Sequence, residues 1–154
     1  MQGTLNIGGT LSVDSDVTFG SSAIVSGSNG IISVGGNLSA TGPIDTGNNT
    51  VVLRDGCIGN TSQISGNFVF QNLTLSSTTG RTFVIPAGAN ITVLGTLTLQ
   101  GAPGQNIQLV SSGGGTGTLH FTTVPPKPTG STVRVPPIIR ARWFMVSSPI
   151  PVPL

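Results

Sequence analysis

The sequence predicts an all-β chain folded as a right-handed parallel β-helix (a β-solenoid) of about five coils, followed by an extended proline-rich C-terminal tail. Three observations lead to this prediction. A five-residue phrase recurs along the 154 residues, apolar residues alternate with Thr, Ser and Asn within each copy, and no window shows the 3.6-residue apolar spacing of a helix. A short unit that cannot bury its apolar face alone is expected to stack on its neighbours.

The recurring phrase is Gly-Thr/Asn-Leu-x-apolar, and one further copy has Gln in place of Gly. From the second copy onward the starts fall at 9, 36, 71, 95 and 117, so the steps are 27, 35, 24 and 22 residues. Steps of this size are typical of solenoid coils. We therefore expect equivalent positions to stack as polar ladders along the axis. The positions concerned are Asn37 and Asn72, together with Thr4, Thr10, Thr96 and Thr118.

The spacing also bears on handedness. The first two copies are six residues apart, at 3 and 9, which a left-handed hexapeptide solenoid would show. The later copies abandon this spacing, so we expect a right-handed, irregular parallel β-helix.

The predicted strands are short apolar runs with period two, which places alternate side chains on opposite faces. Gly-, Asn- and Pro-containing turns separate them. Besides the phrase copies, the runs are 17–19, 23–25, 31–34, 51–53, 68–70, 83–85, 90–93 and 107–110. The turns are 8–9, 28–30, 35–36, 47–49, 55–56, 86–88, 103–104 and 113–115.

Composition argues against several function classes. Charged residues make up 6% of the chain, against about 25% in an ordinary domain. All four acids lie within residues 1–120, whereas four of the six basic residues follow them. No basic stripe with interleaved aromatic residues runs through the repeats, so we expect no nucleic-acid partner. No apolar run approaches the ~20 residues of a membrane span, and no signal peptide is visible at the start.

Two domains are expected: solenoid repeats over 1–123 and a basic, proline-rich tail over 124–154. The tail holds eight of the eleven prolines, and proline cannot donate to a strand ladder. Several interpretations of the tail stay open: an extended or disordered appendage, a strand that caps the coil, a basic-aromatic membrane-surface contact, or a change of reading frame. We do not expect the membrane contact.

Few side chains have the chemistry of a site. Asp14 and Asp16 are the only close acids, and two carboxylates make a poor calcium cage. Arg54 and Asp55 are expected to form a turn pair at a soluble edge. We expect Cys57 to be a small buried hydrophobe, and His120 to point outward by alternation. We therefore assign no catalytic residue, no cofactor-binding residue, no metal ligand and no cofactor.

Three segments carry a resemblance to a known group of proteins: Phe70–Leu75, Thr82–Leu99 and Ile107–Ser112. They resemble the repeats of bacterial cell-surface and secreted β-helix proteins, similar to filamentous haemagglutinin-type adhesins and autotransporter passengers. The resemblance covers roughly 1–123 and is one of repeat style. It implies an exported stalk or adhesive surface, located extracellularly or at the cell surface. Such proteins are far longer and carry an export signal, so this chain is expected to be a fragment.

The expected function is a structural or adhesive module that is not an enzyme. Its Thr/Ser/Asn faces would contact glycans, host or abiotic surfaces, or other copies of the chain, end to end. One alternative is a fragment of a carbohydrate-active β-helix enzyme, which would require Asp14, Asp16 and Arg54 to converge in one groove. Another is a segment of a phage or surface fibre.

Overall fold

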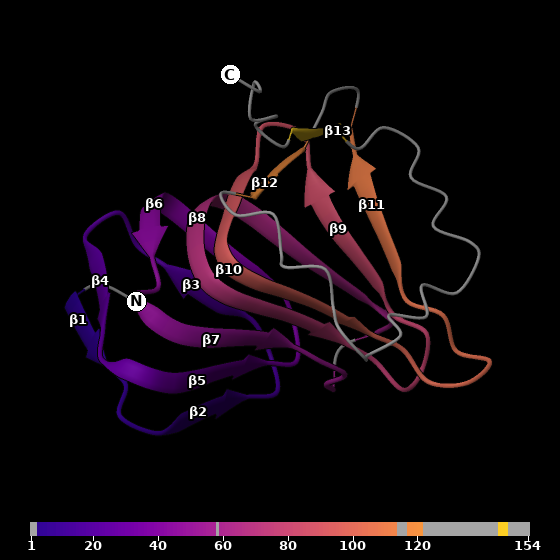
Figure 1. Ribbon diagram of the computed structural model, residues 1–154, viewed down its shortest axis with the longest axis horizontal. Helices are drawn as coiled ribbons and strands as arrows, with labels where there is room; N and C mark the ends of the chain where they lie inside the picture. The colour runs from indigo at the N-terminus through magenta and orange to yellow at the C-terminus, as the bar shows by residue number, and fades with distance from the viewer. Residues whose placement is uncertain (1–2, 58, 114–116, 122–144, 148–154) are drawn as a thin grey trace, which may run out of the picture.

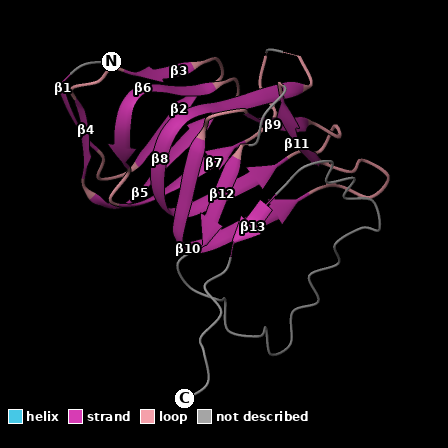
Figure 2. Ribbon diagram, turned by 90° about the horizontal axis from the view of Figure 1, so that it is seen from above, coloured by secondary structure: helices cyan, strands magenta, loops and turns pink. Residues whose placement is uncertain are grey.

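The computed structural model describes residues 3–57, 59–113, 117–121 and 145–147. Within these ranges every regular element is a β-strand, and Figure 2 shows only strands and loops there. The inter-strand ladders are all parallel, and the strands stack as a β-solenoid of about five turns. The predicted all-β fold class and its parallel β-solenoid of about five coils are confirmed.

The described strands are β1 (Gly3–Asn6), β2 (Thr10–Val13), β3 (Val17–Phe19), β4 (Ala23–Ser26), β5 (Ser28–Val34), β6 (Leu38–Asp45), β7 (Asn48–Leu53), β8 (Thr61–Ser76), β9 (Thr82–Pro86), β10 (Asn90–Gln100), β11 (Gln108–Ser112), β12 (Thr118–Phe121) and β13 (Met145–Ser147). Each predicted apolar run falls within or overlaps one of them.

The strands form three ladders, one for each side of the coil. Ladder 1 contains β1, β4, the end of β6, the middle of β8, the start of β10, β12 and β13. Ladder 2 contains β2, β5, β7 and the ends of β8 and β10, which run side by side in Figure 1. Ladder 3 contains β3, the starts of β6 and β8, β9 and β11.

Two strands are much longer than the predicted three to five residues. β8 has 16 residues because it continues around two corners of the coil, from ladder 3 through ladder 1 to ladder 2, and β10 has 11 because it continues around one corner, from ladder 1 to ladder 2. The pairing of β10 with β8 shifts register between Val93 and Thr96, where the strand turns the corner. A bulge of this kind bends a strand without ending it, and alternation of side chains alone does not reveal it.

The expectation that the phrase copies are equivalent positions on successive coils holds for Thr10, Asn72 and Thr96, which share one row of ladder 2. It is wrong for the other three copies. Asn37 lies beside ladder 3, whereas Asn72 lies on ladder 2, where its register partners are Thr50 and Thr96. Thr4 and Thr118 belong to ladder 1. The phrase marks a strand that follows a turn, on whichever side of the coil it lies. The coil length is read instead from ladder 2, where the register partners in order are Thr10, Ile31, Thr50, Asn72 and Thr96.

The core is built from inward-facing rows that run along the axis. One row of register partners on ladder 2 consists of Leu11, Ile32, Val51, Leu73 and Leu97. Its three central members are 1% exposed, whereas the first and last are only partly buried. Stacking equivalent apolar side chains therefore buries the middle coils fully and the outer described coils in part.

The predicted domain boundary at 123/124 lies outside the described residues. Met145–Ser147, within the segment expected to be a tail, form β13 and pair in parallel with β12.

Candidate functional site

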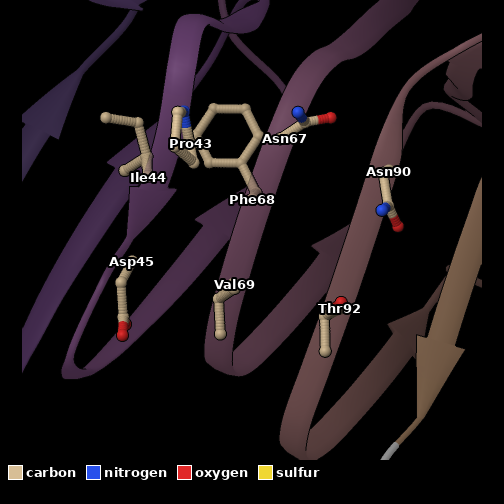
Figure 3. A pocket seen from close by; sticks show the side chains of 8 residues that line it. All are labelled: Pro43, Ile44, Asp45, Asn67, Phe68, Val69, Asn90 and Thr92. Atoms are coloured by element: carbon tan, nitrogen blue, oxygen red, sulfur yellow. The ribbon is translucent and has the colours of Figure 1, made fainter. Parts of the chain in front are cut away.

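A shallow hollow lies on the outer surface of ladder 1, where three strands run in register. Pro43, Asn67 and Asn90 form one row of partners, and Asp45, Val69 and Thr92 form the row two residues on. Because side chains alternate along a strand, both rows face solvent and the row between them faces the core. The hollow has a volume of about 190 Å³. Figure 3 shows its lining side chains.

The floor of the hollow is the buried row Ile44, Phe68 and Ile91, of which the first two line it. The ring of Phe68 stacks on that of Phe70, with centroids 5.2 Å apart, and makes an edge contact with Phe19 at 6.3 Å. Such ring pairs add to the energy of burial. The outer side chains therefore project from a tightly packed base.

The lining offers hydrogen bonds and apolar contact with little charge. The amides of Asn67 and Asn90 both donate and accept, the Thr92 hydroxyl does the same, and Asp45 accepts only. Asp45 Oδ1 already accepts the Gly47 N–H at 2.8 Å. Glycoside hydrolysis ordinarily uses two carboxyl groups, and of the described lining residues only Asp45 carries one. This set of groups is suited to binding neutral, hydroxyl-rich molecules.

A second polar group, here called the polar corner, lies between ladders 2 and 3 and consists of Asp14, Arg54, Asp55, Ser77 and Arg81. Arg81 is 1% exposed. Its guanidinium donates to the backbone oxygen atoms of Gly35, at 3.1 Å, and Gly59, at 2.7 Å, and to Ser62 Oγ. One side chain thus ties together residues from three successive coils.

Asp55 completes this corner. Its carboxylate accepts hydrogen bonds from Ser77 Oγ, from the backbone N–H and hydroxyl of Thr78, and from the Thr79 hydroxyl, at 2.6–3.0 Å. Partial burial on its own would raise the pKa of Asp55, but these hydrogen bonds outweigh it and lower the pKa from 3.8 to about 2. Hydrogen bonds to the charged form favour it.

The predicted turn pair of Arg54 with Asp55 is not an ion pair. Arg54 instead forms an ion pair with Asp14 and donates to Ser12 Oγ and Ser33 Oγ, so it lies across the outer surface of ladder 2. Its contact with Asp55 is to the backbone oxygen, at 2.7 Å.

Asp16 does not share a site with Asp14 and Arg54. Its Oδ1 accepts the backbone N–H of Asn37 at 2.7 Å, and Asn37 Oδ1 accepts that of Gln63 at 2.8 Å. These side chains join three successive coils by one repeated contact. The convergence that a β-helix enzyme would require is therefore limited to Asp14 and Arg54.

Two further expectations had different outcomes. Cys57 is exposed, so the prediction of a buried cysteine is wrong. Cys57 lies in the turn after Gly56, and Gly56 packs against the backbone of Gly35. The Cys57 N–H donates to the backbone oxygen of Asp14 at 3.3 Å. This position leaves the Cys57 side chain outside the core. His120 is half-buried on the outer row of ladder 1, beside Thr92, while Leu119 is buried. Its predicted outward direction is confirmed.

Among the described residues, no three His, Cys, Asp or Glu side chains gather closely enough to hold a metal ion. The same part of the chain contains no helix that could cross a membrane. Comparisons with family models, with curated proteins and with solved structures found no match.

Sequence reasoning missed Asn67, Asn90 and Arg81. Asn67 and Asn90 each precede a buried residue, at Phe68 and Ile91, and stand 23 positions apart, which is one coil. Aligning the sequence on coil length rather than on the phrase would have paired them. Arg81 has no comparable signal, because its partners come from distant positions along the chain.

Proposed function

We propose that this chain is a structural and adhesive module of an extracellular or cell-surface protein, and that it presents uncharged polar rows on a β-solenoid. The observation that carries the proposal is the outer surface of ladder 1, where Asn67, Asn90 and Thr92 surround the hollow over a packed base. Regular rows on a closely packed scaffold hold their groups in place, which reduces the entropy cost of binding.

The contact we propose for the hollow is one ring of a neutral glycan. Its volume is below the about 300–1,000 Å³ of pockets that enclose drug-sized ligands, so it suits one small ring of a longer chain. Asn amides can bridge vicinal hydroxyl groups, and Val69 and Pro43 offer apolar contact for the C–H face. The described lining residues include no cation to attract an acidic sugar. A binding role is favoured over a catalytic one because a single carboxylate is present.

A glycan array probed with the full chain tests this function. We expect weak binding to some neutral glycans, and binding should fall at least about fivefold when both Asn67→Ala and Asn90→Ala are introduced, since each lost hydrogen bond contributes roughly 0.5–1.5 kcal/mol. Asn48→Ala is the matched control, because Asn48 is an exposed strand asparagine on ladder 2. An array with no neutral-glycan binding, or an equal loss of binding in Asn48→Ala, would contradict the proposal that the hollow binds a glycan ring.

Self-association is a second contact that a specific observation favours. Within the described residues, β1, β2 and β3 each pair with a neighbouring strand on one side only. Leu5 and Leu11 at that end are only partly buried. Parallel edges of this kind accept further strands.

A further inference from the structure

The first residues of β5, at the corner between ladders 1 and 2 in the second coil, contain a reactive sequence. Asn29 is exposed and precedes Gly30. It is the one described non-glycine residue with a positive φ, 60°, and it lies where the pairing of β5 with β7 shifts register between Ser28 and Ile31. An asparagine followed by glycine is chemically labile, because the next backbone nitrogen can reach the side-chain amide without interference from a Cβ.

The nitrogen that would attack the Asn29 side chain is the backbone nitrogen of Gly30, and it is hydrogen-bonded to a buried side chain. The Gly30 N–H donates to Asn49 Oδ1 at 3.0 Å. Asn49 is 0% exposed, and its own Nδ2 donates to the Thr46 oxygen at 2.8 Å. The amide that would attack Asn29 is therefore fixed by a hydrogen bond in the interior, with no access to the base that must remove its proton.

We propose that Asn29 is a deamidation site whose reaction Asn49 restrains. In the reaction the Gly30 nitrogen attacks Cγ of Asn29 and forms the N–C bond of a succinimide. The Cγ–Nδ2 bond breaks, and Nδ2 leaves as ammonia with the proton lost from Gly30. Water then opens the ring at either carbonyl, giving aspartate or isoaspartate. The step needs only water, and it proceeds when the hydrogen bond to Asn49 opens.

The modification would loosen the first coil from the second. Isoaspartate lengthens the backbone by one atom, and either product adds a negative charge. The surrounding space is full: a Cβ on Gly27 would lie 2.1 Å from the Ile7 oxygen, and one on Gly30 would lie 2.5 Å from Ile7 Cγ2. A longer backbone must therefore displace Ile7, whose N–H donates to the Ser26 oxygen at 3.0 Å.

Peptide mapping by mass spectrometry tests the site in the full chain. The chain is incubated in mildly alkaline buffer, folded in one sample and unfolded by urea in the other. We expect Asn29 to convert at least about tenfold faster in the unfolded chain, because the folded chain reacts only through local opening. Asn6, exposed and followed by Ile7, is the internal control and should convert slowly in both samples. Equal rates at Asn29 would refute the restraint, and no conversion in urea would refute the site.

The role of Asn49 is tested separately. Asn49→Ala should accelerate conversion of Asn29 in buffer while the circular dichroism stays that of a β-protein, and Asn29→Gln should abolish it. An unchanged rate in folded Asn49→Ala would contradict the proposal. If Asn49→Ala unfolds, hydrogen exchange of the Gly30 amide is measured in the native chain instead. The exchange rate of Gly30 and the conversion rate of Asn29 should rise together with temperature, and independent rates would overturn the inference.

Discussion

Arg81 Nε lies 3.6 Å from Asp55 Oδ1, and this ion pair joins two consecutive coils. The arginine side of the pair is buried, with 1% of Arg81 exposed. Breaking a buried ion pair by removing one partner leaves an uncompensated charge and unpaired acceptors. The polar corner is therefore the place where a single substitution should affect several coils at once.

Arg81→Met should lower the free energy of unfolding by roughly 3–5 kcal/mol, because the Gly35 and Gly59 oxygen atoms lose their buried donor. Urea unfolding followed by circular dichroism measures it. Arg54→Met is the matched control, since Arg54 is partly exposed, and its loss should cost about 1 kcal/mol or less. Similar values for the two variants would contradict the structural role of Arg81.

Acid should weaken the fold through Asp55. Its folded pKa, about 2, lies below the ordinary value of 3.8, so the stabilisation is fully present above about pH 4 and is lost as the pH falls toward 2. The contribution is at most about 2–3 kcal/mol, since one pKa unit corresponds to about 1.4 kcal/mol and solvent screening reduces it further.

Asp55→Asn tests this pH dependence. The variant should be less stable than the native chain at pH 7, and the difference should shrink on acidification to pH 2, as measured by thermal unfolding. Asp45→Asn, an exposed residue with one hydrogen bond, should show little change. A stability difference that stays constant from pH 7 to pH 2 would exclude Asp55 as the titrating group.

Along the inward row of ladder 2, the loss in free energy of unfolding caused by truncating a leucine should be larger in the middle coils than in the outer ones. Leu73→Ala should cost about 2–5 kcal/mol because Leu73 is 1% exposed in the middle of the stack. Leu97→Ala, one coil further and only partly buried, should cost less. Thr74→Ala on the outer face should stay within about 0.5 kcal/mol. Equal costs at Leu73 and Thr74 in urea unfolding would refute the assigned register.

Self-association through the edge of β2 should depend on its side chains. Thr10→Lys places a charge on an exposed edge position, and lysines on edges discourage strand addition. We expect sedimentation velocity to show fewer oligomers for this variant than for the native chain. Thr74→Lys is the control, because Thr74 lies on the outer face of the same ladder and β8 pairs there with a strand on each side. A native chain that remains monomeric at high concentration would contradict edge pairing.

The alternation of Leu73 with Thr74 is local information, which is why the strands and their inward faces could be predicted from the sequence. A period of two identifies the buried side wherever a strand occurs, and glycine-containing turns mark most strand ends. The path of the chain from one coil to the next was harder to predict. Asn72 and Thr96 were paired correctly, because both the phrase and the coil place them 24 residues apart. Asn37 carries the same phrase on another ladder, and nothing within five residues distinguishes the two.

By itself the sequence determined that this chain is an all-β repeat protein with an apolar interior and an uncharged polar exterior, since composition and alternation depend on neighbouring residues alone. Only the tertiary structure decided which side chains meet. Asn67 reaches Asn90 because coils of unequal length still bring ladder 1 into register, and Arg81 is buried because acceptors separated by up to 46 residues surround it. Such contacts depend on the sum of every turn between them, and no local pattern records that sum.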